Sequence, residues 1–235
     1  MKIISIHQPE TFPYAGYFNK MMNSDEFIIL DNVQFKKNNY QNRNRIVHEG
    51  KPKWLTFPVI DKGRLESTIA STKLANTVDW RSRNLKVLED AYKDCPYFYY
   101  HMPTLKHIIK YSDDNLLLLN MAVINYIREC LHIKTDIIYA SDLDITSHKS
   151  DLVFDICKAR GADAYLSGKG GRDYLDTSKF DEEGIIVQYQ EFIDNIPYVQ
   201  KSDEFIPYMS VIDLLMNNSN DDATDYVRSV FRYNT

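Results

Sequence analysis

Ile3-Ile4-Ser5-Ile6-His7-Gln8-Pro9 is the stretch that decides the fold of this 235-residue chain. Apolar residues run up to His7 and stop at a polar residue and a proline, as a buried strand does at the edge of a sheet. A short helix over 17–22 and a second apolar strand over 27–30 follow, and that strand stops at Asp31. This order predicts an α/β domain with a mostly parallel Rossmann-like sheet. Ligands bind beyond the carboxyl ends of such strands, so we expect His7, Gln8 and Asp31 at a binding site.

The composition is that of an ordinary globular protein, with 44% apolar and 26% charged residues. The net charge of −5 argues against bulk affinity for nucleic acid, so we expect no such partner. The longest aliphatic run, 116–119, is far too short to span a bilayer, and no signal-peptide pattern follows Met1. Three scattered cysteines without a CxxC pair are typical of free thiols in a reducing compartment. We therefore expect a cytoplasmic protein.

The rest of the chain predicts one domain over 1–235 with two additions to the sheet. Helical spacing from Thr77 onward predicts a helical insertion at about 77–132. Extended residues over 43–47 and 54–59 predict a β-hairpin that turns at 50–52. After the insertion we expect strands over 136–140, 164–166 and 185–190 and helices over 151–160, 211–216 and 222–231.

A segment dense in amides and cations follows Asp31. From Lys36 to Lys53 six lysines and arginines stand against one acid, Glu49, which gives a local charge of +5. Such a run is most often a solvated loop. Here, however, amides alternate with arginines, and arginine can hold a phosphate through two parallel hydrogen bonds. The residues of this segment that we expect to bind a substrate are Gln34, Asn42, Arg43, Asn44 and Arg45.

The two kinds of side chain in this segment point to opposite faces of the predicted strand. Alternation places Arg43 and Arg45 on one face and Asn42 and Asn44 on the other. The sequence leaves open which pair faces a ligand.

Glycines and cations also follow the strand expected over 164–166, in the segment Ser167-Gly168-Lys169-Gly170-Gly171-Arg172. Glycines allow backbone N–H groups to approach a phosphate, and the cations add charge. The segment has neither the Walker A spacing nor the GxGxxG pattern, so a flexible turn is the alternative. Its place directly after a strand favours phosphate binding.

Further motifs are spread over nearly the whole chain. They are Ile6-His7-Gln8-Pro9, Pro13, Gly16-Tyr17-Phe18, Ser24-Asp25, Phe27, Asp31, Val33-Gln34-Phe35, Gln41-Asn42-Arg43-Asn44, Ile46, Trp54-Leu55-Thr56, Pro58-Val59, Tyr165-Leu166-Ser167-Gly168, Gly170, Tyr174-Leu175, Tyr198, Gln200, Phe205, Pro207, Ser210 and Asp213-Leu214-Leu215. In these positions the chain resembles the WbqC-like family of bacterial proteins, which are met in surface-polysaccharide and O-antigen biosynthesis loci. The resemblance implies a protein that makes or decorates a sugar precursor, including by acyl or aminoacyl transfer to an amino sugar. With it, Tyr17, Tyr174 and Gln200 join Gln8 among the expected substrate-binding residues.

A looser likeness is to the nucleotidylyltransferases with the HxGH signature, which hold nucleotide phosphates between a first strand and a helix N-terminus. His7 stands for the first polar group of that signature. Tyr17 follows Gly16 where the signature has its second histidine. This departure argues against adenylyl transfer.

Together these signals predict a transferase that acts on a sugar nucleotide or an amino-sugar precursor. His7 would be the general base because imidazole titrates nearest neutral pH, and Asp31 would orient it. Arg43, Arg45, Lys169 and Arg172 would hold phosphates. The alternatives are a non-catalytic protein that binds a sugar nucleotide or glycan, and ATP-dependent nucleotidylyl transfer or ligation. No residue spacing indicates a metal site, and any cofactor stays open.

Overall fold

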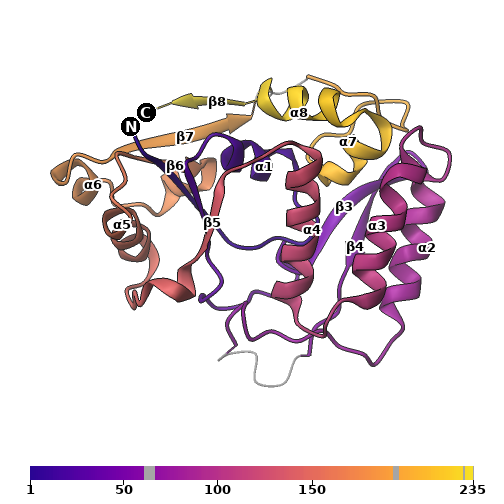
Figure 1. Cartoon of the computed structure of the whole chain (residues 1–235), viewed down its shortest axis with the longest axis horizontal. Coiled ribbons are helices and arrows are strands. Elements are labelled where there is room, and N and C mark those ends of the chain that lie inside the picture. Colours follow the sequence, from indigo (N-terminus) through magenta and orange to yellow (C-terminus); the bar gives the residue numbers. More distant parts are fainter. Residues whose placement is uncertain (61–66, 193–195, 230, 235) are drawn as a thin grey trace.

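The computed structural model describes residues 1–60, 67–192, 196–229 and 231–234. Its main sheet has six strands in the order β5-β2-β1-β6-β7-β8, and only β8 runs antiparallel to its neighbour (Figure 1). The strands are β1 Ile3–His7, β2 Glu26–Ile29, β5 Asp136–Tyr139, β6 Ala164–Gly168, β7 Ile186–Phe192 and β8 Phe231–Asn234. This order confirms the mostly parallel Rossmann-like sheet. The order reverses between β1 and β6, the place where such sheets bind ligands.

The helices lie on both faces of the sheet and in the predicted insertion. They are α1 Ala15–Met22, α2 Trp80–Tyr92, α3 Phe98–Tyr111, α4 Leu116–Cys130, α5 Lys149–Ala159, α6 Ser178–Glu182, α7 Val211–Asn217 and α8 Asn220–Ser229, with 3-10 helices η2 Ala140–Leu143 and η3 Lys169–Asp173. Helices α2, α3 and α4 make up the insertion, which lies beside the hairpin at the end of the molecule away from α5 and α6 (Figure 1).

The hairpin is confirmed, but its turn differs from the prediction. Strands β3 Arg43–His48 and β4 Lys51–Thr56 are joined by two residues, Glu49 and Gly50, both with positive φ (52° and 67°). Two left-handed residues match the twist of paired strands, so this turn is favoured over a wider one. The expected turn at 50–52 was therefore placed too late, because Pro52 already pairs with Val47 in the ladder.

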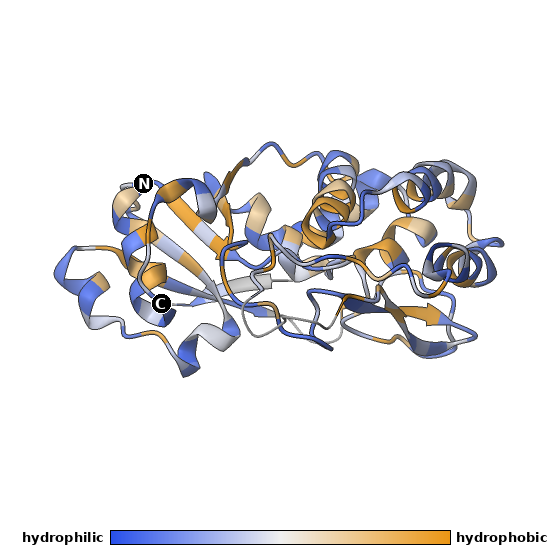
Figure 2. Ribbon diagram, turned by 90° about the horizontal axis from the view of Figure 1, so that it is seen from below, coloured by the Kyte–Doolittle hydropathy of each residue, from blue (hydrophilic) through white to orange (hydrophobic). Residues whose placement is uncertain are grey.

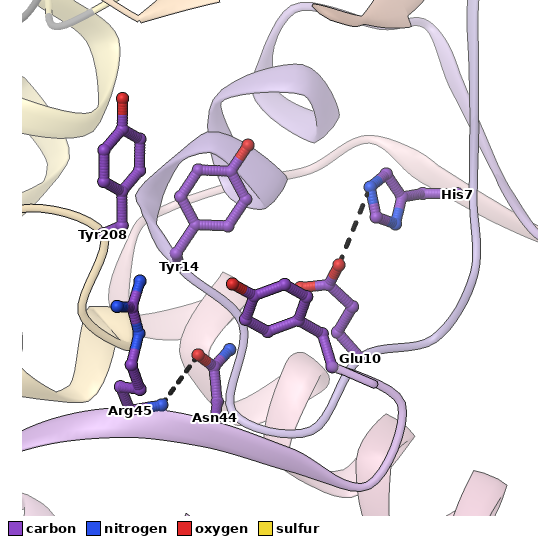
Figure 3. Close-up of a pocket in the computed structure, with 7 residues that line it drawn as sticks. His7, Glu10, Tyr14, Asn44, Arg45 and Tyr208 are labelled. Carbon is purple, nitrogen blue, oxygen red and sulfur yellow. Dashed lines mark hydrogen bonds and ion pairs between the residues drawn. The ribbon is translucent and has the colours of Figure 1, made fainter. Parts of the chain in front are cut away.

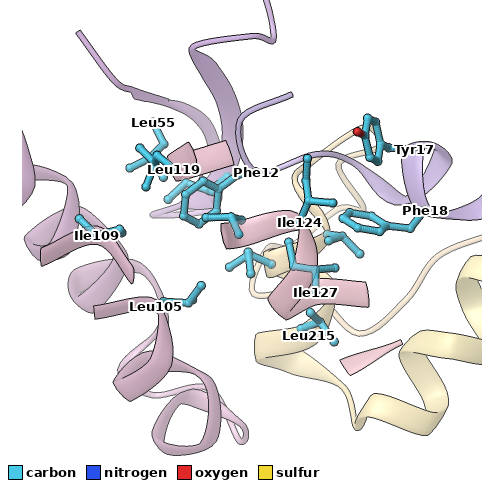
Figure 4. Packing of buried hydrophobic residues seen from close by; sticks show 14 of the residues in the cluster. Phe12, Tyr17, Phe18, Leu55, Leu105, Ile109, Leu119, Ile124, Ile127 and Leu215 are labelled. Carbon is cyan, nitrogen blue, oxygen red and sulfur yellow. The ribbon is translucent and has the colours of Figure 1, made fainter. Parts of the chain in front are cut away.

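Two apolar clusters cover the two faces of the sheet, because side chains alternate along each strand. Ile4, Ile6 and Ile28 pack on the face that carries α5 and α6. Phe27 and Ile29 face the larger cluster, in which α1, α4 and α7 meet. Figure 4 shows that this cluster continues from α1 through α4 to α3. Figure 2 shows apolar residues both in strands of the main sheet and on helices.

The end of the chain departs from its predicted pattern. Helical spacing was expected to continue to residue 231, but α8 ends at Ser229 and residues 231–234 return as β8 beside β7. Within the described residues, every helix is too short or too polar to cross a bilayer.

Candidate functional site

Remote segments fix the loop that leaves β1, over residues 8–14. The backbone N–H of Thr11 donates to the carbonyl of Tyr40 at 2.8 Å, and the amide of Asn44 donates to the carbonyl of Phe12 at 3.0 Å. Phe12 has a φ of 47°, an uncommon conformation for an aromatic residue, and its side chain is fully buried. The hairpin therefore sets the path of this loop.

That path brings three titratable side chains together at the end of β1. Glu10 is 9% exposed, and its Oε1 atom lies 3.9 Å from Nε2 of His7 (Figure 3). Its Oε2 atom is buried and has no hydrogen-bond partner among the described residues. Lys20 of α1 is 2% exposed, and its Nζ atom lies 3.5 Å from the carbonyl oxygen of Ile6. Buried charges without close partners are costly, so they mark a candidate functional site.

Burial shifts the protonation of all three groups. It raises the pKa of Glu10 to about 7, although the positive charge of Lys20 opposes this rise. It lowers the pKa of Lys20 to about 7, against the effect of the Glu10 charge. It also lowers the pKa of His7 to about 3, and the Lys20 charge lowers it further. At neutral pH His7 is therefore neutral, while Glu10 and Lys20 are the groups that titrate.

One hydrogen bond determines which nitrogen of His7 carries the proton. Its Nδ1 atom lies 3.0 Å from the carbonyl oxygen of Gln8. A carbonyl only accepts, so Nδ1 must be the protonated nitrogen of the neutral ring. The lone pair is then on Nε2, the nitrogen that faces Glu10.

His7 and Glu10 line a cavity of about 380 Å³. This volume lies near the lower end of the range for small-molecule sites, about 300–1,000 Å³. Its lining residues are His7, Glu10, Tyr14, Tyr40, Asn44, Arg45 and Tyr208 (Figure 3). They come from the end of β1 and the loop after it, from β3 and the segment before it, and from the segment before α7. An aromatic lining with a few convergent polar groups suits a ligand that combines a ring with polar substituents.

A second cavity of about 200 Å³ lies on the other side of His7, where the strand order reverses. It is lined by Ile6, His7, Gln8, Leu30, Val153, Tyr165 and Tyr174. His7 lines both cavities, so the two adjoin each other at this residue.

Gln8 lines this second cavity, and hydrogen bonds orient its side-chain amide. The backbone N–H of Lys36 donates to Oε1 of Gln41 at 2.7 Å, which leaves Nε2 of Gln41 to donate to Oε1 of Gln8, also at 2.7 Å. These two bonds fix the orientation of both amides. The NH₂ group of Gln8 is then the part of its amide that can donate to a ligand, and its natural partner is a carbonyl or another acceptor.

The carboxylate beside His7 is Glu10, whereas we had expected Asp31. Asp31 accepts hydrogen bonds from the backbone N–H of Ser141 at 3.0 Å and from its hydroxyl at 2.8 Å. It therefore holds η2 against the end of β2. The sequence contained Glu10 three residues after His7, but its burial depends on contacts with distant segments.

The hairpin contributes one residue from each face to the first cavity, Asn44 and Arg45. Arg43 and Arg45 lie over the ring of Trp54, with distances of 4.2 Å and 5.7 Å from each guanidinium carbon to the ring centre. Asn42 is buried and donates to the carbonyl of Phe57 at 3.0 Å, which is a structural role.

The glycine segment lines neither cavity. Ser167 and Gly168 end β6, and the following residues, including Lys169 and Gly170, form η3. Gly171 has no room for a side chain, because a Cβ atom there would overlap Oγ of Ser167. This contact, and the helical turn itself, explain the glycine as a packing requirement.

Two other residues of the glycine segment and the tyrosine that follows it take different roles. Arg172 lies 4.1 Å from the ring centre of Tyr189 and 3.6 Å from a carboxylate oxygen of Glu191. Gly168 lies beside the buried Lys20, since a Cβ at Gly168 would lie 3.9 Å from Nζ of that lysine. Tyr174, which follows the segment, lines the second cavity.

Three further expected binding residues also lie outside the cavities. The ring of Tyr17 packs 4.9 Å from the ring of His7, and its buried hydroxyl has no partner among the residues described. Gln200 donates to a carboxylate oxygen of the buried Asp213 at 2.7 Å. Gln34 is exposed and pairs through its backbone with Thr68. No group of three or more His, Cys, Asp or Glu side chains in the described part of the chain could hold a metal ion.

Comparison with known proteins agrees with the resemblance seen in the motifs. An uncharacterized Mycobacterium tuberculosis protein, Rv1507c, is 34% identical over 229 residues, which cover 97% of this chain and 98% of the relative. No solved structure matches the chain. The model of the WbqC-like protein family matches residues 8–225, from the loop after β1 to α8. The chain therefore belongs to the WbqC-like protein family.

Proposed function

We propose that this chain is a group-transfer enzyme that acts on an amino-sugar or sugar-nucleotide precursor of a bacterial surface polysaccharide. The observation that supports catalysis best is the buried Glu10 in the wall of the larger cavity, with one oxygen unpartnered among the described residues. Its pKa of about 7 allows it both to accept and to release a proton near neutral pH. The precursors are soluble molecules, so we place the reaction in the cytoplasm.

The larger cavity would hold the acceptor sugar. Tyr14, Tyr40 and Tyr208 offer ring faces for its apolar surface, and Asn44 and Arg45 offer polar contacts for its substituents. An amine or hydroxyl of the sugar would lie between Glu10 and His7. There, the lone pair on Nε2 of His7 would accept one hydrogen bond from the attacking group and so orient it.

The smaller cavity would hold the acyl group of an activated donor, an ester of a phosphate or of a thiol. Its walls are mostly apolar, and the NH₂ group of Gln8 can donate to the acyl carbonyl oxygen. The acceptor nitrogen would attack the carbonyl carbon and form a C–N bond. The bond from that carbon to the leaving oxygen or sulfur would break, and the proton lost from nitrogen would pass to Glu10.

Lys20 would stabilise the ionised form of Glu10. It is buried beside the end of β1, and its positive charge lowers the pKa of the carboxyl from the still higher value that burial alone would give. The pKa of the general base thereby stays near neutral pH, so that its carboxyl can ionise there.

The decisive variant is Glu10→Gln, which keeps the size of the side chain and removes its basicity. We expect it to bind acceptor sugars as the wild type does and to lose turnover by about 10²–10⁴-fold. Binding is measured by thermal shift with UDP-sugars, dTDP-sugars and ATP, and product by mass spectrometry with activated acyl donors. Turnover by Glu10→Gln at the wild-type rate would refute the role of Glu10.

The aromatic lining of the larger cavity would equally suit a non-catalytic protein that binds a sugar nucleotide or glycan. The same panel separates the two functions. Tight binding of a sugar nucleotide, with no product from any acyl donor or from ATP, would favour the binding protein. Product formed only with ATP would favour nucleotidylyl transfer or ligation.

A further inference from the structure

The outer face of the β3–β4 hairpin carries an exposed tryptophan between two arginines. Arg45 and Trp54 are directly opposite in the ladder, so they share one face, and Arg43 lies two residues away on that face. Trp54 is 43% exposed, an unusual degree for a large aromatic side chain on a strand. The other tryptophan of the chain, Trp80, is 1% exposed.

The two arginines lack the acidic partners that surface arginines commonly have. Neither Arg43 nor Arg45 forms an ion pair with any residue the structure describes, and the Nε atoms of both are buried without a hydrogen-bond partner there. The two guanidinium groups of this face are therefore available to bind an anion.

The hairpin face is continuous with the larger cavity. Arg45 belongs to both, since it lies over Trp54 and lines the cavity. Tyr40 also lines the cavity, and its ring centre lies 6.1 Å from that of Trp54. Figure 3 shows Glu10 and Arg45 in the wall of the same cavity. A ligand that places one part beside Glu10 can therefore extend past Arg45 onto the indole ring.

We propose that this face binds the nucleoside diphosphate part of a nucleotide-linked sugar. The diphosphate lies against Arg43 and Arg45, the base stacks on the exposed part of Trp54, and the sugar enters the cavity. Guanidinium groups bind phosphate oxygens in pairs, and aromatic side chains stack on any base. The inference rests on the proposed function for the sugar, and it moves the phosphates away from the glycine segment, where Arg172 already contacts Glu191.

The test uses the fluorescence of Trp54. UDP, dTDP and ADP are titrated into the full chain, and we expect the base to quench the emission of Trp54 while the buried Trp80 gives a constant background. Calorimetry measures the affinity in parallel. We expect Trp54→Ala and Arg43→Ala each to weaken nucleoside diphosphate binding by about tenfold or more. Both residues are partly exposed, so the melting temperature should change little.

Arg172→Ala is the matched control, because Arg172 also lies over an aromatic ring but belongs to the glycine segment. It should bind UDP, dTDP and ADP as the wild type does. The proposal is overturned if Arg172→Ala loses binding while Arg43→Ala keeps it, or if none of the three nucleotides binds. Binding of inorganic pyrophosphate as tight as that of UDP, with Trp54→Ala unchanged, would overturn the stacking of the base.

This outcome is independent of catalysis. Glu10→Gln should bind UDP like the wild type, since Glu10 lies in the cavity and away from the hairpin face. If UDP binds the hairpin and no product ever forms, the transferase fails and the nucleotide site stands. If an amino sugar is acylated but no nucleotide binds, the nucleotide site fails and the transferase stands.

Discussion

The Oε1 atom of Glu10 lies 3.9 Å from the Nε2 atom of His7, and the second of these atoms carries a lone pair. The pKa values of the two side chains are in the reverse of their ordinary order, since the carboxyl has a higher pKa than the imidazole. Burial lowers the pKa of the imidazole to about 3, so the ring is neutral at neutral pH, and it raises the pKa of the carboxyl to about 7. The carboxyl is therefore the group that can exchange a proton with a ligand near neutral pH.

The first prediction concerns the pH dependence of turnover. A general base must be ionised, so kcat/KM should rise with pH and level off above a midpoint near 7, the pKa of Glu10. Lys20 titrates in the same range, so this midpoint belongs to the pair. The rise should be absent from the residual activity of Glu10→Gln. A midpoint near 3 that disappears in His7→Gln would instead assign the base to His7.

The second prediction concerns Lys20, whose charge lowers the pKa of Glu10. Lys20→Met removes that charge and keeps the length of the side chain, so the carboxyl should become harder to ionise. The midpoint of the pH–rate profile should move above 7, by about one pH unit or more. Lys169→Met is the matched control, since Lys169 is exposed and lines neither cavity. An unmoved midpoint in Lys20→Met would contradict the coupling.

The third prediction concerns stability. The pKa of Glu10 is raised on folding from 4.5 to about 7, so its favourable contribution is complete below pH 4.5 and is lost as the pH rises to about 7. Such a shift corresponds to a loss of about 3 kcal/mol in the free energy of unfolding. Urea unfolding at pH 4.5 and pH 7.5 should show this loss in the wild type relative to Glu10→Gln. A constant difference between the two proteins would contradict the raised pKa.

The fourth prediction separates Asp31 from the reaction. Asp31→Ala leaves the backbone N–H of Ser141 without its partner, which should lower the free energy of unfolding by about 1–3 kcal/mol. Its affinity for acceptor sugars and its kcat should stay within about twofold of the wild type below the melting temperature. If Asp31→Ala instead folds with unchanged stability and loses turnover, Asp31 belongs to the catalytic group.

The fifth prediction uses two glycines of one segment. A Cβ at Gly171 would overlap Oγ of Ser167, whereas a Cβ at Gly170 would meet no atom within 4 Å. Gly171→Ala should therefore destabilise the protein by about 1–3 kcal/mol, and Gly170→Ala should be neutral. Thermal unfolding measures both, and neither change should alter nucleotide affinity. A loss of affinity in the stable Gly170→Ala variant would restore the segment as a phosphate site.

The local pattern of the sequence predicts the elements of this fold well. Apolar runs give β1, β2, β5, β6 and β7, and helical spacing gives the insertion of α2, α3 and α4. The strand β8 was missed because its pairing with β7 comes from tertiary contact, which overrides a local helical pattern. The turn of the hairpin was misplaced because a proline can occupy a strand when its missing N–H is not needed.

The site was harder to predict than the fold. His7, Gln8, Asn44 and Arg45 were named from the sequence and do line the cavities. Glu10 was missed, because nothing near it in the sequence shows that its carboxyl is buried. The burial of Glu10 depends on the path of the loop after β1, which hydrogen bonds to Tyr40 and Asn44 hold in place. Lys20 was missed for the same reason, since a lysine on a short helix is ordinarily exposed.

Tyr14 pairs with Ser210 through a backbone bridge, and the backbone N–H of Ser210 also donates to the carbonyl of Arg45 at 2.7 Å. Three segments that are far apart in the sequence are thereby joined around one cavity. Contacts of such long range form late in folding, because the loops between them must close first. A nascent chain on the ribosome would therefore have no working cavity until the segment around Ser210 has been synthesised, and ligand binding would report on the completion of folding.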